Sequence, residues 1–308
     1  MSLYSKLQPK GPSGFGYGSA AEDVTAGLSL AGKTFLVTGC NSGLGLETAR
    51  VLAMRGGRIV GTARTAEKAS VALAPLGERT VGVECELSEP RSVRAGVKAV
   101  KAALGGAKID ALICNAGIMA LPTLEQKFGV ELQLFTNHVG HFILVTGLLD
   151  ELAEAGRVVM VSSRAHLRAP KGGIEFDNLA GERDYSPWKA YGQSKIANIL
   201  LAKELARRLD GTKKTANAIH PGVIFTNLSR HMNPVARLVF QAAGSLFMKN
   251  VGEGAATQCY VATHPAAASI SGKYWVDSNV AEPRADGTDP ATAARLWTVT
   301  EDLVSRLP

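Results

Sequence analysis

The stretch TFLVTGCNSGLG, residues Thr34–Gly45, decides the fold. Its first half is a run of apolar and β-branched residues, which is typical of a buried strand. Three glycines follow at the spacing GxxxGxG, and the next residues have the spacing of a helix. This order aims helix N–H groups at one point, which favours a bound pyrophosphate. We therefore expect a dinucleotide to contact Gly39, Asn41, Ser42, Gly43, Leu44 and Gly45.

The rest of the chain repeats this alternation of short apolar runs and longer helical patterns. Strands joined by helical crossovers form a mostly parallel sheet. The pattern predicts one doubly wound α/β sheet with helices on both faces. The seven strand-like runs are Thr34–Gly39, Arg58–Arg64, Thr80–Leu87, Ala111–Gly117, Arg157–Ser163, Thr215–Gly222 and Lys273–Val276.

Helical spacing occupies the connections between these runs. Ser88 is the expected N-cap of one such helix, with Pro90 in its first turn. No internal repeat or interdomain linker interrupts the pattern, so we expect residues 31–308 to form one domain. Residues 1–30 are rich in Gly, Ser and Pro and are expected to lie over the body or stay mobile. The helical patterns cover Leu44–Gly56, Thr65–Ala74, Ser88–Leu104, Leu124–Leu152 and Ser186–Leu209.

Composition narrows the class of protein. The net charge is +7, but basic residues are dispersed and aromatic residues make up 6% of the 308, so a nucleic-acid partner is not expected. The first residues have no apolar core and no apolar run approaches the ~20 residues of a membrane span, so we expect a cytoplasmic protein without a transmembrane segment. His138 and His141 lack a third ligand, and the four cysteines have no metal-ligand spacing, so no metal is expected.

The segment YGQSK supplies the chemistry. Tyr191 and Lys195 are four residues apart on a predicted helix and share one face. A free tyrosine has a pKa of about 10 and is a poor base near neutrality. A nearby ammonium, or the positive ring of an oxidised nicotinamide, lowers that pKa. Tyr191 can then exchange a proton with a carbonyl or alcohol oxygen, although on its own the pair is equally typical of a helix surface.

The end of the second strand bears on cofactor choice. An NAD enzyme generally has an acidic residue there for the ribose hydroxyls. This chain instead has Thr62-Ala63-Arg64. A guanidinium pairs well with a 2′-phosphate, so Arg64 favours NADP over NAD. The alternative is that Arg64 is a solvated surface residue.

These motifs together resemble the short-chain dehydrogenase/reductase family, whose signatures are TGxxxGxG and YxxxK, over nearly the whole body from about Lys33 to Trp297. The resemblance implies a Rossmann-like fold and an oxidoreductase that transfers hydride between a nicotinamide and a carbonyl or alcohol. It implies a catalytic Ser163, with Ser162 facing the sheet or a backbone group, and an Asn137 that bends its helix and holds a water in a relay toward Lys195. Tyr191 and Lys195 are also expected to contact the cofactor.

The same resemblance extends the cofactor site. CNAG resembles the NNAG signature, with Cys114 as a departure, and ELS occupies the place of an adenine-contacting Asp, with Glu86 as a departure. Glu86 is equally typical of a surface carboxylate at a strand end. HPGVIFT resembles the segment that approaches the nicotinamide carboxamide. The additional cofactor residues implied are Glu86, Leu87, Asn115, Ala116, Gly117, Pro221, Gly222, Ile224 and Thr226.

The later sequence resembles the retinol dehydrogenase and WW-domain oxidoreductase-like branch, which favours lipophilic substrates. Two stretches are expected to shape the substrate site: residues 164–188, with Phe176, Tyr185 and Trp188, and residues 225–250. The second has the spacing of an amphipathic helix, which could be a lid, a membrane-contacting face or a helix packed on the core. Many relatives pair their long helices into dimers or tetramers.

The leading hypothesis is NADPH-dependent reduction of a lipophilic aldehyde or ketone. The alternatives are NAD-dependent oxidation of a secondary alcohol and a cofactor-binding sensor without catalysis. Loss of Ser, Tyr or Lys would mark a sensor, and all three are present. A sugar-nucleotide epimerase normally carries TGxxGxxG and a longer substrate domain, which this chain lacks.

Overall fold

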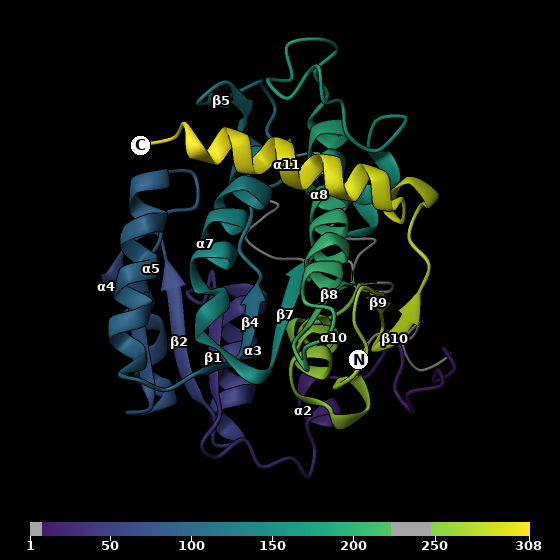
Figure 1. Ribbon diagram of the computed structural model, residues 1–308. Helices are drawn as coiled ribbons and strands as arrows, with labels where there is room; N and C mark the ends of the chain where they lie inside the picture. The colour runs from purple at the N-terminus through teal and green to yellow at the C-terminus, as the bar shows by residue number, and fades with distance from the viewer. Residues whose placement is uncertain (1–7, 223–247) are drawn as a thin grey trace.

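The computed structural model describes residues 8–222 and 248–308 and has the expected doubly wound α/β architecture (Figure 1). Within the described residues, the central sheet has eight strands in the order β10-β9-β8-β7-β4-β1-β2-β3. All neighbours pair in parallel except β9 and β10. The strands are β1 Thr34–Thr38, β2 Arg58–Ala63, β3 Thr80–Glu84, β4 Ile109–Cys114, β7 Leu152–Val161, β8 Thr215–His220, β9 Tyr274–Val276 and β10 Asn279–Ala281.

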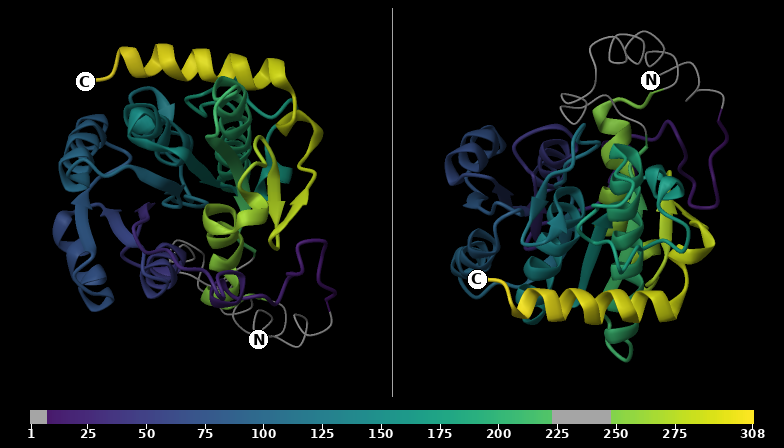
Figure 2. Two further views of the ribbon diagram at one scale, coloured as in Figure 1. Left: turned by 60° about the horizontal axis from the view of Figure 1, so that its bottom comes forward. Right: turned by 90° about the horizontal axis from the view of Figure 1, so that it is seen from above.

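Helices cover both faces of this sheet, as the two views of Figure 2 show. One face carries α5, α7 and α8, and the other carries α3, α4 and α10. Strand β1 is buried at every position because Leu36 packs into the first layer while Phe35 and Val37 pack into the second. The helices are α3 Gly43–Met54, α4 Ala66–Leu73, α5 Pro90–Leu104, α7 Gly140–Leu148, α8 Pro187–Arg208 and α10 Val251–Thr263.

The seven expected strands are present, and the sequence analysis missed an eighth, β10. This strand has three residues and pairs antiparallel with β9 through a tight turn at Asp277 and Ser278. Both turn residues have positive φ, 52° and 63°. Such a two-residue turn matches the twist of a hairpin. A strand so short has no periodic pattern that would reveal it.

The long helix predicted from Leu124 begins later. Residues 126–131 instead form a small hairpin of β5 (Gln126–Lys127) and β6 (Val130–Glu131). Phe128 and Gly129 make its turn with φ of 51° and 75°. Helix follows from Leu132, in α6 (Leu132–Leu134), a π-helical turn at Phe135–Val139 and then α7. The prediction of a helical start at Leu124 was wrong because the glycine at 129 permits a hairpin.

The same stretch corrects the expectation about apolar runs. Residues Leu132–Glu151 are long and apolar enough to cross a membrane when judged by length and composition. However, 78% of this window is buried inside the fold. A helix that is buried on most sides is apolar all round without contacting lipid.

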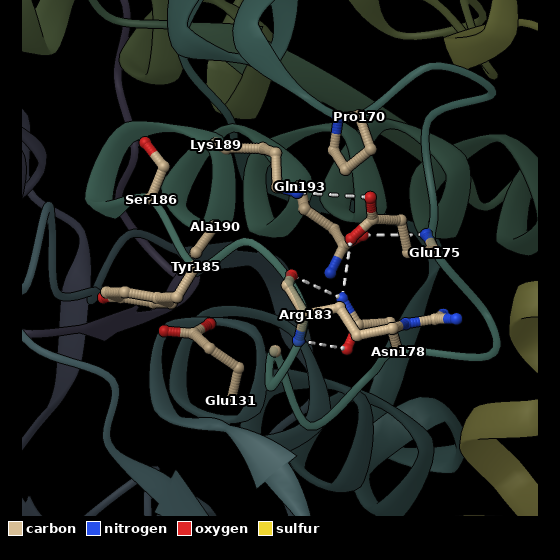
Figure 3. A pocket seen from close by; sticks show the side chains of 11 residues that line it. Glu131, Pro170, Glu175, Asn178, Arg183, Tyr185, Ser186, Lys189, Ala190 and Gln193 are labelled. Atoms are coloured by element: carbon tan, nitrogen blue, oxygen red, sulfur yellow. Dashed lines mark hydrogen bonds and ion pairs between the residues drawn. The ribbon is translucent and has the colours of Figure 1, made fainter.

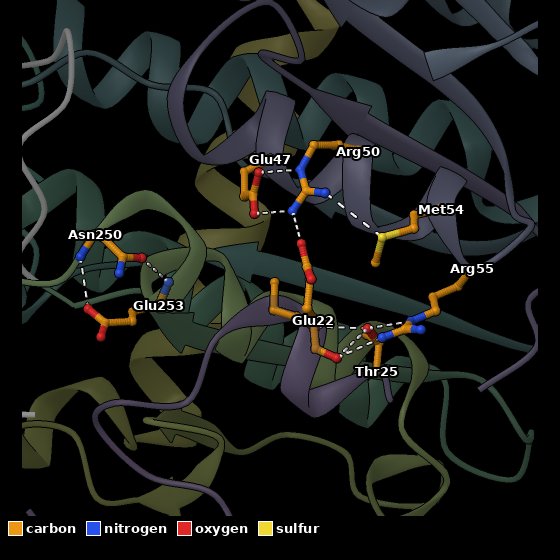
Figure 4. A network of polar contacts seen from close by, with 9 residues as sticks. Glu22, Thr25, Glu47, Arg50, Met54, Arg55, Asn250 and Glu253 are labelled. Carbon is orange, nitrogen blue, oxygen red and sulfur yellow. Dashed lines mark hydrogen bonds and ion pairs between the residues drawn. The ribbon is translucent and has the colours of Figure 1, made fainter. Parts of the chain in front are cut away.

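The N-terminal segment, from residue 8 onward, lies over the body. It contains a short helix α2 (Ala21–Val24) that packs on α3 and α10. Polar contacts fix its position (Figure 4): Arg50 of α3 binds Glu22 at 2.5 Å and Glu47 at 2.8 Å, and Arg55 donates to the Glu22 carbonyl at 2.9 Å. The described part of the extension is therefore held against the first βαβ unit.

The C-terminal helix α11 (Pro290–Ser305) crosses the outer side of α8 (Figure 1). Trp297 is 5% exposed, lies edge-on to Phe142 of α7 at 4.8 Å and has the Arg208 guanidinium 4.0 Å from its ring centre. A partner that paired through α7 and α8 would therefore meet α11 on this face.

Trp297→Ala should lower the free energy of unfolding by about 3–5 kcal/mol, because it empties the space between α11, α7 and α8. Urea denaturation of the full-length protein measures the change. The exposed neighbour Thr298 is the control, and Thr298→Ala should stay within about 0.5 kcal/mol of wild type. A Trp297→Ala change below about 1 kcal/mol would show that α11 is not a fixed part of the fold.

Candidate active site

The glycine-rich loop forms a cradle at the carboxyl end of β1. Gly39 and Gly43 adopt left-handed φ values of 68° and 55°. A Cβ at Gly45 would collide with the Gly39 carbonyl oxygen, so the loop and the first turn of α3 are in direct backbone contact. The N-terminus of α3, at Gly43, opens at this loop. Its free N–H groups and helix dipole suit an anionic pyrophosphate.

The segment after β4 is fastened beside this cradle. The Thr38 hydroxyl accepts hydrogen bonds from the backbone N–H groups of Asn115 and Ala116, both at 2.9 Å. The Asn115 side chain in turn donates to the Thr38 carbonyl at 2.9 Å. A Cβ at Gly117 would lie 2.8 Å from Asn137 Oδ1 and 3.5 Å from Lys195 Nζ. Gly117 therefore marks the point where the cofactor loop meets the helix-borne polar residues.

Arg64 is exposed just beyond the end of β2. The Cys40 N–H donates to the Thr62 carbonyl at 3.0 Å, which places the end of β2 beside the glycine loop. Asn41, Ser42 and Leu44 lie in the same loop and first helical turn.

The Glu86 carboxylate forms hydrogen bonds with a residue two positions further along the chain. Its carboxylate accepts from the Ser88 N–H at 3.2 Å and the Ser88 hydroxyl at 3.0 Å. Leu87 is buried in the core. The prediction of Ser88 as an N-cap was wrong, because Ser88 is committed to Glu86 and Glu89 occupies the cap position before Pro90.

Tyr191 and Lys195 lie on the buried face of α8, as the spacing predicts. They are 6% and 3% exposed, and the Lys195 ammonium lies 5.4 Å from the Tyr191 ring centre. Lys195 Nζ donates to the Val161 carbonyl at 3.2 Å. Burial raises the pKa of Tyr191 to about 12, and a hydrogen bond with the Ser163 side chain opposes that rise. Burial lowers the pKa of Lys195 to about 8.

Ser162 and Ser163 directly follow β7 and have different partners. The Ser163 side chain lies close enough to Tyr191 to oppose the rise in its pKa, and its hydroxyl accepts from the Ala165 N–H at 3.1 Å. Ser162 is turned the other way, and its hydroxyl donates to the Lys195 carbonyl at 2.7 Å. The expected Ser163, Tyr191 and Lys195 are thus brought together, while Ser162 fixes the backbone of α8, as expected.

Asn137 lies within the π-helical turn Phe135–Val139 and joins the two halves of the site. Its Oδ1 accepts from the Ile118 N–H at 2.8 Å, and its Nδ2 donates to the Ile118 carbonyl and to Ser194 Oγ, both at 2.9 Å. The Ser194 hydroxyl donates to the Tyr191 carbonyl at 2.8 Å. π-Helical turns occur frequently at functional sites, and this one interrupts the α-helical pattern at Asn137, where a bend was expected.

Pro221 and Gly222 follow β8, at the same edge of the sheet. Gly222 has a φ of 102°, and a Cβ there would lie 2.5 Å from Lys249 Cδ. Lys249 is buried and forms an ion pair with Asp277 at 2.5 Å. Ile224, Thr226 and most of the expected stretch 225–250 lie outside the described residues.

The expected substrate stretch 164–188 is fastened to α8. The Glu175 N–H donates to Gln193 Oε1 at 2.8 Å, and Lys189 reaches the Glu175 carboxylate at 3.3 Å (Figure 3). The small polar pocket between these residues has room for little more than one water molecule. Trp188 lies edge-on to Tyr191 at 6.2 Å and gives that side of the tyrosine an aromatic wall.

Comparisons with known proteins agree with this geometry. The model of the family described as short chain dehydrogenase matches residues 33–236. The chain belongs to the short-chain dehydrogenase family. It is 39% identical to the short-chain dehydrogenase TIC 32 B, chloroplastic, of Brassica napus, with 100% of both chains covered. It is also 37% identical to retinol dehydrogenase 14 of Homo sapiens, covering 90% of this chain and 87% of that one.

A solved short-chain dehydrogenase of Burkholderia cenocepacia J2315 in complex with NADP is also similar. It is 25% identical with a TM-score of 0.63, covering 81% of this chain and 97% of that one. Short-chain dehydrogenases are oxidoreductases that bind NAD(P). The residues of this chain fit such a cofactor, because the Gly39–Gly45 cradle excludes side chains where a pyrophosphate needs close approach.

Sequence reasoning missed two residues that organise this dehydrogenase site. Thr38 was treated only as part of the glycine motif, and His141 was expected to be a packing or hydrogen-bonding residue without a part in the site. Thr38 Oγ1 lies 2.9 Å from His141 Nε2, and His141 Nδ1 lies 3.0 Å from the Asn137 carbonyl oxygen. The four-residue spacing of Asn137 and His141 on one predicted helix was the available signal.

Turnover by this dehydrogenase should fall as the pH rises through about 8, the pKa to which burial lowers Lys195. The sign follows because Lys195 is charged below that pKa and neutral above it, and only the ammonium supports a proton transfer by Tyr191. Measuring kcat/KM from pH 6 to 10 tests this. Lys98→Met, at an exposed lysine of α5, should leave the profile unchanged. A flat profile up to pH 10 in wild type would contradict the role of Lys195.

Proposed function

We propose that this protein is an NADPH-dependent reductase of lipophilic aldehydes and ketones. The observation that carries the proposal is the convergence of Tyr191, Ser163 and Lys195 in one buried site, beside an edge of the sheet that carries the glycine cradle. The aromatic wall of Trp188 beside Tyr191 supports an apolar substrate. The names of the similar retinol dehydrogenases support the same substrate class.

The proposed roles follow from the positions of the side chains. When bound, NADPH supplies the hydride that reduces the carbonyl carbon. Tyr191 donates its phenolic proton to the carbonyl oxygen, and Ser163, whose side chain lies beside Tyr191, stabilises the same oxygen. The Lys195 ammonium, 5.4 Å from the ring centre, stabilises the phenolate that remains. Asn137 holds Ile118 and Ser194 on either side of this group.

The choice of NADPH rests on Arg64. Its guanidinium is exposed at the end of β2, at the position where an NAD enzyme generally has a carboxylate. The NADP complex of the similar Burkholderia enzyme supports the proposal. A phosphate on the ribose would accept paired N–H groups from Arg64, whereas a bare hydroxyl would gain little from a cation.

Tyr191→Phe should reduce kcat at least about a thousandfold, because it removes the proton donor, and leave NADPH affinity within about threefold of wild type, a small free-energy change. A panel of aldehydes, ketones and secondary alcohols, assayed with both cofactors, provides the substrate, and fluorescence titration provides the affinity. Wild-type turnover in the variant would overturn the mechanism. A wild-type protein that binds NADPH but converts no member of the panel would favour the sensor alternative.

Arg64→Ala should raise the KM for NADPH at least about tenfold, the loss of one charge-assisted contact, and leave the KM for NADH nearly unchanged. Arg79→Ala is the matched control, because Arg79 is exposed directly before the neighbouring strand β3. An unchanged NADPH KM in Arg64→Ala would contradict the NADP assignment. Preference of the wild type for NAD⁺ and an alcohol would favour the dehydrogenase alternative.

A further inference from the structure

Two buried histidines form hydrogen bonds with the peptide group that joins Ser163 to Arg164. Its carbonyl oxygen, on Ser163, lies 2.7 Å from His166 Nδ1. Its N–H, on Arg164, donates to His220 Nδ1 at 3.3 Å. His166 follows in the short helix Arg164–Arg168, and His220 is the last residue of β8. Two imidazoles from different elements thus satisfy opposite ends of one peptide unit.

The hydrogen-bond partners assign a different tautomer to each ring. The Arg284 N–H donates to His166 Nε2 at 3.2 Å, so Nε2 carries a lone pair and the proton of His166 is on Nδ1, where it is donated to the Ser163 carbonyl. His220 accepts the Arg164 N–H at Nδ1, so its proton is on Nε2. Both rings must be neutral, because an imidazolium has no lone pair with which to accept an N–H.

Burial favours those neutral forms. His166 and His220 are 3% and 4% exposed, and burial lowers the pKa of both, that of His220 to about 3. Arg164, Arg284 and Lys249 add positive charge around the rings, which opposes protonation further, whereas the hydrogen bond to the Ser163 carbonyl and the Asp286 carboxylate act in the other direction on His166. The Tyr274 ring packs edge-on against His166 at 5.2 Å.

Arg284, near the C-terminal end of the chain, holds the residues that follow His166. The Arg284 guanidinium donates to the carbonyl oxygens of Ala169 at 2.7 Å and Pro170 at 2.5 Å, and pairs with Asp286 at 2.6 Å. The segment after Ser163 is therefore tied at His166 and again at Ala169–Pro170. Its backbone has little freedom to shift.

We propose that His166 and His220 are positioning residues for the reaction, which together hold the Ser163–Arg164 peptide so that the Ser163 hydroxyl faces Tyr191. This inference rests on the proposed function of Ser163. The histidines act through the backbone and touch neither substrate nor cofactor in this role. Their removal should slow the chemical step, because an error of about 1 Å in the placement of a reacting group can cost about a hundredfold in rate, while cofactor binding is spared.

The test uses substitutions that keep or remove a single hydrogen bond. In His220→Asn, Oδ1 takes the place of the accepting Nδ1, and in His166→Asn, Nδ2 takes the place of the donating Nδ1–H. His220→Leu and His166→Leu can do neither. His264→Leu is the matched control, because His264 also accepts a backbone N–H, from Ala266 at 3.2 Å, but at the end of α10.

Each Leu variant should lose at least about tenfold in kcat, the equivalent of one buried hydrogen bond, with the NADPH KM within about twofold of wild type. Each Asn variant should recover most of that loss, and His264→Leu should match wild type. Wild-type kcat in both Leu variants, or Asn variants no faster than the Leu variants, would overturn the proposal.

Amide hydrogen exchange on the full-length protein gives a readout that does not depend on turnover. Exchange at Arg164 should be faster in His220→Leu than in wild type and close to wild type in His220→Asn. Unchanged exchange of the Arg164 amide in His220→Leu would overturn the proposed role of His220, whatever the activity of the variant. If wild type converts no substrate, yet exchange at Arg164 changes as expected, the proposed function is wrong, while the histidine hydrogen bonds to the peptide are supported.

Discussion

The hydroxyl of Thr38 makes three hydrogen bonds on which the rest of the site depends. It accepts the N–H groups of Asn115 and Ala116, which uses both of its lone pairs. Its own proton must then go to His141 Nε2, 2.9 Å away, so His141 carries its proton on Nδ1 and donates it to the Asn137 carbonyl. Burial lowers the pKa of His141 to about 4, which keeps the ring neutral as this chain of bonds requires.

This chain of hydrogen bonds joins two parts of the protein that have separate tasks. Thr38 ends β1, directly before the glycine cradle, and Asn137 lies in the π-helical turn that contacts Ser194 of α8. Ser194 in turn donates to the carbonyl of Tyr191. Hydride transfer requires the nicotinamide of a cofactor in the cradle and the carbonyl carbon of a substrate at Tyr191 to lie about 3–3.5 Å apart in a defined orientation. Neutral imidazoles with fixed tautomers, at His141 and again at His166 and His220, hydrogen-bond the backbone around these residues without introducing a charge.

The parts that the sequence predicted are those governed by local patterns. The GxxxGxG turn needs glycine for steric reasons, so a short stretch of sequence is enough to recognise it. The spacing of Tyr191 and Lys195 places both on one side of a helix, whatever that helix packs against. The eight-stranded sheet followed from alternating apolar runs, except for β10, which is too short to show a period. The hairpin at Gln126–Glu131 was mistaken for helix because its strands have two residues each.

The parts that the sequence could not give depend on contacts between distant segments. The resemblance implies an adenine contact for Glu86, yet only the structure shows its carboxylate bound to Ser88. The tautomers of His141, His166 and His220 depend on partners 103, 118 and 56 residues away along the chain. The order of the motifs therefore indicates what the site contains, and the fold decides which nitrogen of each ring carries a proton.

The protonation state of His141 most directly tests the hydrogen-bond chain that starts at Thr38. Long-range proton–nitrogen correlation spectra of the full-length protein, labelled with ¹⁵N-histidine, distinguish the two neutral tautomers from the imidazolium, and His141→Gln assigns the signal. At pH 7 these hydrogen bonds require a neutral His141 with its proton on Nδ1. A charged ring, or a neutral ring with its proton on Nε2, would contradict the hydrogen-bond chain from Thr38 to Asn137.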